Sequence, residues 1–129
     1  MIILDSCKTK SENKRFFIKA AMEKIISDKS SPFILLIDED NNYTNFLKKY
    51  NYIIIDIFDI NEDEIREKLE SNPDLFLLNI KYPVEYCLNE IKKIEKIVDK
   101  SGRISMLIYD SNDIHKASFI IDEYNNLEI

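Results

Sequence analysis

The sequence predicts one three-layer α/β domain over residues 1–129, with a five-stranded parallel sheet and helices on both faces. Three observations support this fold class. Five short apolar runs are rich in β-branched and aromatic residues. Helical patterns separate these runs. The connections are too long for hairpins and long enough for right-handed crossovers.

The five apolar runs are the predicted strands. Most of them are continuous rather than alternating, which is typical of strands covered on both faces. They are Met1–Leu4, Phe33–Ile37, Tyr52–Phe58, Leu75–Ile80 and Ile104–Tyr109.

The intervening segments carry apolar residues at helical spacing. Asn61 and Glu64 are spaced as a helix cap with its reciprocal acid. Pro83 and the single glycine, Gly102, delimit the longest pattern. The apolar stripes consist of Ile18, Met22, Ile25 and Ile26; Tyr43, Phe46, Leu47 and Tyr50; Ile65 and Leu69; Val84, Cys87, Leu88, Ile91, Ile94 and Val98; and Ile114, Ala117, Ile121 and Tyr124.

Composition narrows the class of protein. The net charge is −6, so we expect no nucleic-acid partner and no attraction to anionic membranes. No apolar run reaches the ~18 residues of a membrane span, and we expect no membrane insertion. Two cysteines are too few for a disulfide scaffold and indicate a cytoplasmic protein. With only one histidine, the sequence offers few ligands for a zinc site.

Carboxylates follow several predicted strands. Asp38 and Asp40 come after the second strand, and Asp56 lies in the third. Because the carboxyl ends of parallel strands share one edge of a sheet, these side chains are candidate ligands for Mg²⁺. The alternative is that they are ordinary solvated residues at strand ends.

The loop before the first helix is basic. It contains Lys8, Lys10, Lys14 and Arg15, although cations oppose the dipole at a helix N-terminus. A bound anion would reverse the sign of that interaction, which makes these four residues candidate anion or nucleotide ligands. A solvated lysine loop is the alternative interpretation.

The order of these features resembles the ParA/MinD-like family of deviant-Walker P-loop ATPases. That family has a phosphate loop, KGGxGK[ST], then a strand ending LLIDxD and another reading YDYIIID. The corresponding text here is KTKSENKR, FILLIDED and YNYIIID. The resemblance implies a sheet order of 2-3-1-4-5, with the first strand at the centre. It also implies ATP or ADP with Mg²⁺ as the ligand, and a homodimer.

The phosphate loop departs from the family pattern. Lys8 and Asn13 occupy the glycine positions, and Arg15 replaces the Mg²⁺-binding Ser/Thr. A side chain at those glycine positions obstructs a backbone that wraps phosphate. We therefore predict no catalytic residues and a non-catalytic regulatory or protein-interaction module, a pseudo-ATPase with at most weak nucleotide binding. No cofactor or partner is specified by the sequence.

A second resemblance is to the receiver domains of response regulators. It rests on ILLIDED and NPDLFLLNIKYP, and it gives receiver-like roles to Asp38, Glu39, Asn79 and Tyr109. Asn79 would occupy the phosphoacceptor position, and an amide cannot become an acyl phosphate. This alternative is a permuted, phosphorylation-independent receiver with sheet order 3-2-4-5-1.

A third resemblance is to PIN-domain ribonucleases, which begin with text similar to MIILDS. It implies a metal-dependent nuclease that would use Asp5, Asp38, Asp56 and Asp110. The remaining spacing does not fit that family, and the negative net charge is unfavourable for an RNA substrate.

Overall fold

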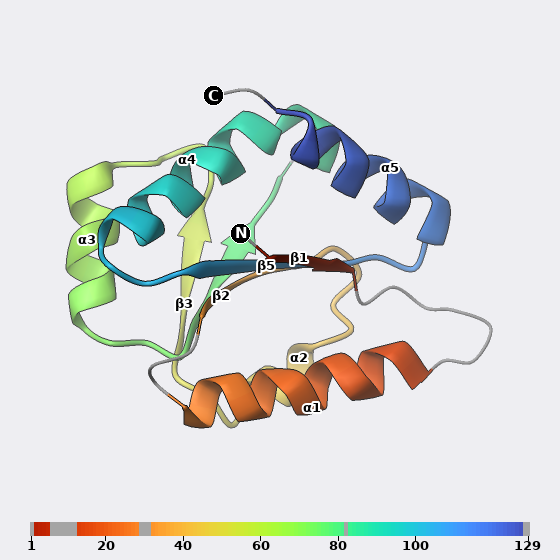
Figure 1. Ribbon diagram of the computed structural model, residues 1–129, viewed down its shortest axis with the longest axis horizontal. Coiled ribbons are helices and arrows are strands. Elements are labelled where there is room, and N and C mark those ends of the chain that lie inside the picture. The colour runs from red at the N-terminus through yellow and green to blue at the C-terminus, as the bar shows by residue number, and fades with distance from the viewer. Residues whose placement is uncertain (1, 6–12, 29–31, 82, 128–129) are drawn as a thin grey trace.

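The computed structural model describes residues 2–5, 13–28, 32–81 and 83–127. Helices and strands alternate along the chain (Figure 1). In order, the elements are β1 (Ile2–Asp5), α1 (Asn13–Ser27), β2 (Phe33–Asp38), α2 (Thr44–Leu47), β3 (Tyr52–Asp56), α3 (Glu62–Glu70), β4 (Leu75–Asn79), the 3₁₀ turn η1 (Val84–Tyr86), α4 (Leu88–Lys100), β5 (Ser105–Asp110) and α5 (Ile114–Asn125).

The strands form one parallel sheet, which confirms the predicted α/β class. The order is β1-β5-β2-β4-β3. Strands β2 to β5, counted by themselves, have the order 2-3-1-4, which is compatible with open Rossmann-like sheets. β1 pairs with β5 from Ile2 opposite Met106 to Asp5 opposite Tyr109.

The predicted sheet order 2-3-1-4-5 is wrong, because β2 and not β1 lies at the centre. β2 pairs with β5 over six residues on one side and with β4 over three residues on the other. β1 has four residues and lies at the edge. The order 3-2-4-5-1 of the permuted receiver is wrong as well: it places β1 correctly beside β5 but exchanges β2 and β4.

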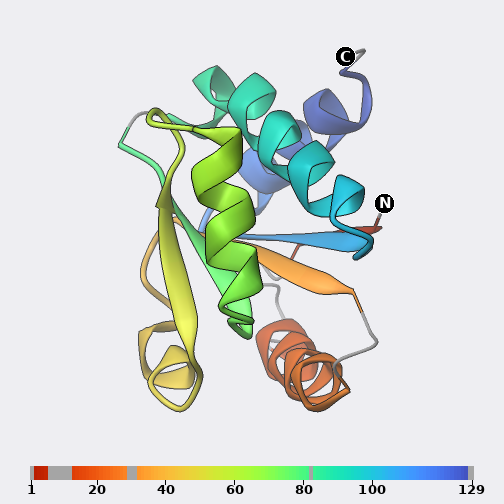
Figure 2. The ribbon, with the colours of Figure 1, turned by 90° about the vertical axis from the view of Figure 1, so that its left-hand side faces the viewer.

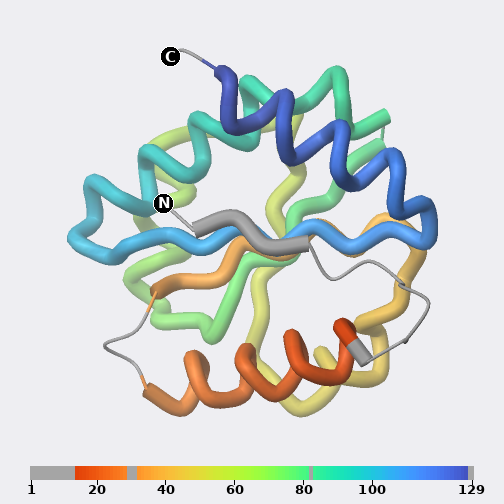
Figure 3. The backbone as a smooth tube through the Cα atoms, turned by 45° about the vertical axis from the view of Figure 1, so that its right-hand side comes forward, coloured from red at the N-terminus to blue at the C-terminus, as the bar shows by residue number. Residues whose placement is uncertain are grey.

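Helices cover both faces of the sheet. α1 and α2 lie on one face, and α3, α4 and α5 lie on the other (Figures 1 and 2). The tube in Figure 3 shows the same arrangement, with β5 between the two helical layers. Alternate residues of β2 therefore enter different cores: Ile34 and Leu36 pack toward α1, whereas Phe33 and Leu35 pack toward α4.

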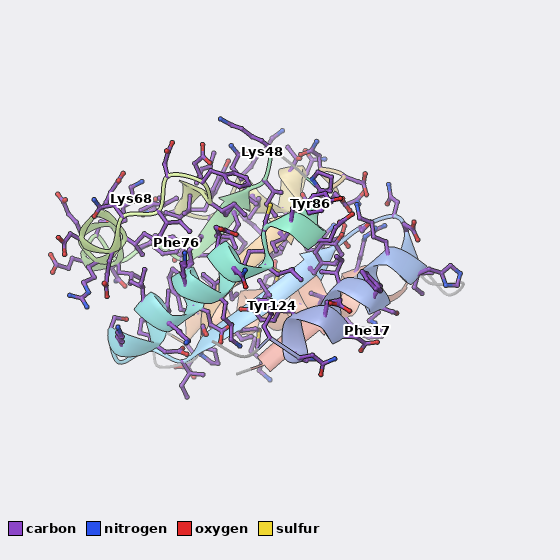
Figure 4. All side chains as sticks on the ribbon, turned by 90° about the horizontal axis from the view of Figure 1, so that it is seen from above. Phe17, Lys48, Lys68, Phe76, Tyr86 and Tyr124 are labelled. Atoms are coloured by element: carbon purple, nitrogen blue, oxygen red, sulfur yellow. The ribbon has the colours of Figure 1, made fainter. Side chains whose placement is uncertain are left out.

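The larger core lies beneath α3, α4 and α5. It contains the whole predicted stripe of the long helix, and the rings of Phe33 and Phe76 meet edge to face at 4.8 Å. Tyr124 lies where α5 meets α4, and its hydroxyl is bonded to the buried carboxylate of Glu95 (Figure 4). On α5, Ile120 rather than the predicted Ile121 is buried.

Local capping explains several boundaries. Asn61 accepts a hydrogen bond from Glu64 N, as predicted, and begins α3. Asp113 accepts from the backbone N–H groups of His115 and Lys116 and begins α5. β3 ends at Asp56, before the predicted Phe58, because Asp56 accepts turn hydrogen bonds from the next residues. No helix in the described part of the chain is both long and apolar enough to span a bilayer.

Candidate functional site

The site expected from the fold lies at the carboxyl end of β2. From there the chain passes to α2 on one face, whereas β4 and β5 on either side lead to α4 and α5 on the other. Such a reversal leaves a crevice beyond the strand ends, where ligands bind in open α/β sheets. Polar side chains from β2, β5, α1 and α5 meet at this position.

Asp38 is the last residue of β2 and closes the turn that follows. Its Oδ1 accepts from Asn42 N and its Oδ2 from Tyr43 N, both at 2.8 Å. Asn41, within this turn, has a φ of 58°. Burial raises the pKa of Asp38, against the lowering effect of the two backbone hydrogen bonds. Asp38 thus stabilises the loop conformation as a half-buried acceptor.

Asp110, the last residue of β5, is a fully buried carboxylate. Its Oδ1 accepts from Arg15 Nε at 2.8 Å, and its Oδ2 accepts from Asn42 Nδ2 at 2.8 Å. Arg15 also donates through Nη2 to Asn112 Oδ1 at 3.0 Å. The first turn of α1 is therefore joined to the ends of β5 and β2 through one carboxylate.

Glu39 forms the second polar centre. Tyr109, buried in β5, donates its hydroxyl to Oε2 at 2.8 Å, and Lys116 of α5 donates to Oε1. Burial by itself would raise the pKa of Glu39, but the hydrogen bonds from Lys116 and Tyr109 outweigh it, and the pKa is lowered. The hydrogen bond to Glu39 raises the pKa of Lys116.

Backbone contacts complete the connection between the loops after β2 and β5. Glu39 N donates to the carbonyl of Asp110 at 3.1 Å, and Asn112 N donates to Asp40 Oδ2 at 2.8 Å. The two loops are thus linked just beyond the Asp38–Asp110 register pair. These polar contacts hold the loop after β2 against the loop after β5.

A groove of about 790 Å³ lies on the β4 side of β2. Its polar wall contains Asp38, Glu39, Asn79, Lys81 and Lys116. Its apolar wall lies toward the edge of the sheet and contains Leu47, Tyr52, Ile54 and Leu77. The groove therefore runs from the strand ends to the outer strand β3.

The predicted anion-binding residues divide into two pairs. Lys8 and Lys10 lie outside the described residues. Lys14 and Arg15 lie in the first turn of α1. The guanidinium of Arg15 is bonded to Asp110 and Asn112, so an anion would have to compete with these internal acceptors.

The predicted metal ligands lie on two strands that are not neighbours. Asp38 ends β2 and Asp40 follows it, whereas Asp56 ends β3, with β4 between the two strands. Asp56 forms an ion pair with Lys81 at 3.3 Å. Throughout the described ranges, no group of three or more His, Cys, Asp or Glu side chains could hold a metal ion.

The residues of the receiver-like alternative lie on neighbouring strands. Asp38 ends β2 and Glu39 follows it, Asn79 ends β4, and Tyr109 lies in β5. For the nuclease-like alternative, Asp38 and Asp110 are register partners. Asp56 lies two strands from Asp38, and Asp5 lies on the edge strand β1.

Sequence reasoning missed the residues that join the loops, namely Asn42, Asn112 and Lys116. All three follow a strand end within a few residues: Asn42 after β2, and Asn112 and Lys116 after β5. Asp113 as the cap of α5 places Lys116 in the first turn of that helix. That cap could have pointed to Lys116, whereas nothing local indicates its pairing with Glu39, 77 residues away.

The fold and site define an open α/β domain with a polar crevice beside its central strand. Comparison with known proteins finds no matching family model, no matching curated protein and no matching solved structure.

Proposed function

We propose that this chain is a non-catalytic regulatory or protein-interaction module. The observation that supports this proposal is the hydrogen bonding of the carboxylates around the end of β2. Asp38, Glu39 and Asp110 each accept donors from the chain itself on both of their oxygens. A hydrolase needs such carboxylates for metal or water, whereas here they stabilise the junction of two loops.

The backbone around the crevice gives further support. A phosphate cradle needs backbone N–H groups that point at the ligand. After the central strand β2, the N–H groups of Asn42 and Tyr43 donate to Asp38 instead. Arg15, in the position of the family's Mg²⁺-binding hydroxyl, is bonded to Asp110. Both features favour a domain without nucleotide turnover, whereas the edge position of β1 counts against the strand order that the ATPase resemblance implies.

A phosphorylation-independent receiver is the second candidate. The position of β1 beside β5 favours it, as do the neighbouring strand ends that carry Asp38 and Asn79. The exchange of β2 and β4 counts against it. Because Asn79 cannot accept a phosphoryl group, this candidate also acts through protein contacts rather than through chemistry on the domain.

Thermal melts with ATP, ADP and inorganic phosphate, each with and without Mg²⁺, test the proposal. A ligand that binds the native state stabilises it by RT ln(1 + [L]/Kd), so millimolar ligand reveals even a weak site. We expect unchanged midpoints and no ATP turnover. A Mg²⁺-dependent shift that Lys14→Ala abolishes and Lys24→Ala retains would instead establish a nucleotide site.

Beryllofluoride with Mg²⁺ tests the second candidate, the phosphorylation-independent receiver, because this complex mimics a phosphoryl group on a carboxylate. We expect no shift in the melting midpoint of the wild type. The matched variant is Asn79→Asp, which restores the carboxylic acid at the phosphoacceptor position. A shift in this variant that Asp38→Asn removes would favour receiver ancestry, and a shift in the wild type would contradict a phosphorylation-independent module.

A further inference from the structure

The strand β3 is an open edge of the sheet. Among the described residues it pairs with β4 alone, from Tyr52 opposite Leu75 to Asp56 opposite Asn79. Figure 2 shows β3 at the outer side of the sheet, with α3 over one face and α2 beside its lower end. Unpaired backbone groups along such an edge can bind a further strand.

The hydrogen bonds at the ends of β3 show which residues face outward. Asn51 accepts from Asp74 N, and Ile57 N donates to Asn79 O, so both residues face β4. Because backbone groups alternate in direction along a strand, Ile53 and Ile55 also face β4. The amide and carbonyl groups of Tyr52 and Ile54 consequently point toward the open edge.

The side chains on this edge are apolar and accessible. Ile54 is 54% exposed and Tyr52 is 36% exposed, and both line the apolar wall of the groove beside Leu77. The strand contains neither lysine nor proline, the residues that commonly prevent pairing at an edge. The short helix α2 leaves this face of β3 uncovered because it ends at Leu47.

Charge favours one orientation of an added strand. Lys48 and Lys49 precede β3, whereas Asp56 ends it and Asp59 follows it. Lys49 and Asp56 also form ion pairs within the chain, with Glu23 and Lys81 respectively. A second β3 in antiparallel orientation brings the basic end of each strand to the acidic end of the other. The same surface on both copies is then self-complementary, as a twofold interface requires.

We propose that a second copy of this chain pairs with β3, so that two sheets join as one across a twofold axis at Ile54. Ile54 then lies opposite its equivalent, and Tyr52 lies opposite Asp56 of the other copy. This register pairs the outward-facing groups of both strands and brings the two Ile54 side chains together on the α2 face. This inference rests on the proposed role as a protein-interaction module, and it identifies the partner as a second copy of the chain.

Sedimentation equilibrium of the full chain at increasing concentration tests the dimer. We expect reversible monomer–dimer association, and Ile54→Lys should weaken it several-fold, since it places two cations together at the axis. The matched control is Ile104→Lys, because Ile104 is 65% exposed just before β5 and away from β3. A monomer at every concentration, or a dimer unaffected by Ile54→Lys, would overturn the proposal.

A cysteine at position 54 tests the register. In a hydrogen-bonded antiparallel pair the facing Cα atoms lie about 5.5 Å apart, within the range of a disulfide. We expect Ile54→Cys, with Cys7 replaced by serine, to form a disulfide-linked dimer on oxidation. Tyr52→Cys is the control, because its equivalents are about 14 Å apart. Equal cross-linking of both variants would contradict this register.

The dimer and the proposed function can fail separately. A monomeric chain with unchanged melts in nucleotide would remove the dimer and keep the non-catalytic role. A dimer that also hydrolyses ATP would keep the edge pairing and contradict that role.

Discussion

Arg15 Nε lies 2.8 Å from Oδ1 of Asp110, and these two residues are 95 positions apart in the chain. The Asp110 side chain is fully buried, and the Arg15 side chain is 18% exposed. A buried carboxylate needs charged or polar donors because desolvation penalises its ionised form. This contact fixes the start of α1 against the end of β5 and joins the cluster around the central strand.

Replacement of Arg15 should therefore destabilise the fold. We expect Arg15→Met to lower the free energy of unfolding by about 1.5–3 kcal/mol, the range for hydrogen bonds to charged groups. Urea denaturation measures the change. Arg15→Lys should recover only part of the loss, because lysine lacks the planar fork. Lys24→Ala, on the exposed side of α1, is the control; an equal loss there would argue against a specific role for Arg15.

The pH dependence of stability should reflect Glu39. Its folded pKa lies below the ordinary 4.5, so the folded state binds fewer protons than the unfolded state in this range. Its contribution is present above pH 4.5 and is lost as pH falls through the lowered pKa. Urea melts from pH 7 to pH 3 should show a shallower acid-side decline for Glu39→Gln than for the wild type. Parallel curves would contradict this contribution.

Glu95 should behave in the opposite way. Burial raises its pKa despite the hydrogen bond from Tyr124 and the nearby Lys92. The folded state therefore favours the protonated form, and stability falls as pH rises from 4.5 through the raised pKa. We expect Glu95→Gln to melt higher than the wild type at pH 7, with the difference vanishing at pH values below 4.5. A lower midpoint at pH 7 would show that the ionised form is required.

The cap of α5 should contribute measurably to stability. Asp113 accepts from two backbone N–H groups at 3.1 Å, so Asp113→Ala should cost about 1 kcal/mol. Chemical denaturation against Asp122→Ala, an exposed position on the same helix, isolates the cap from a general loss of charge. Asp113→Asn should retain most of the stability, since asparagine is an equally good cap.

Much of the fold was predictable from local pattern. The apolar runs located the strands because strands covered on both faces must be apolar along their whole length. The Asn61 cap and the stripe ending at Val98 were predictable because capping and helical spacing depend on residues a few positions apart. These features determine which segments are strands and helices.

The order of the strands was not determined in this way. The run Met1–Leu4 is as apolar as a central strand, but apolar composition reports that helices cover a strand's faces, not how many strands pair with it. β2 and β4 are likewise both apolar runs, and their exchange relative to the receiver order changes no local signal. Only the long-range pairing of β2 with both β5 and β4 places β2 at the centre.

The sequence by itself determined the α/β class, the strand-end positions of the acidic residues and the absence of phosphate-loop glycines. The tertiary structure decided which of those residues meet. Asp38 and Asp110 became register partners, while Asp56 was placed two strands from Asp38. Glu39 met Lys116 across 77 residues. The physical reason is that strand ends become neighbours through long-range pairing, which carries no signature within a few residues of each site.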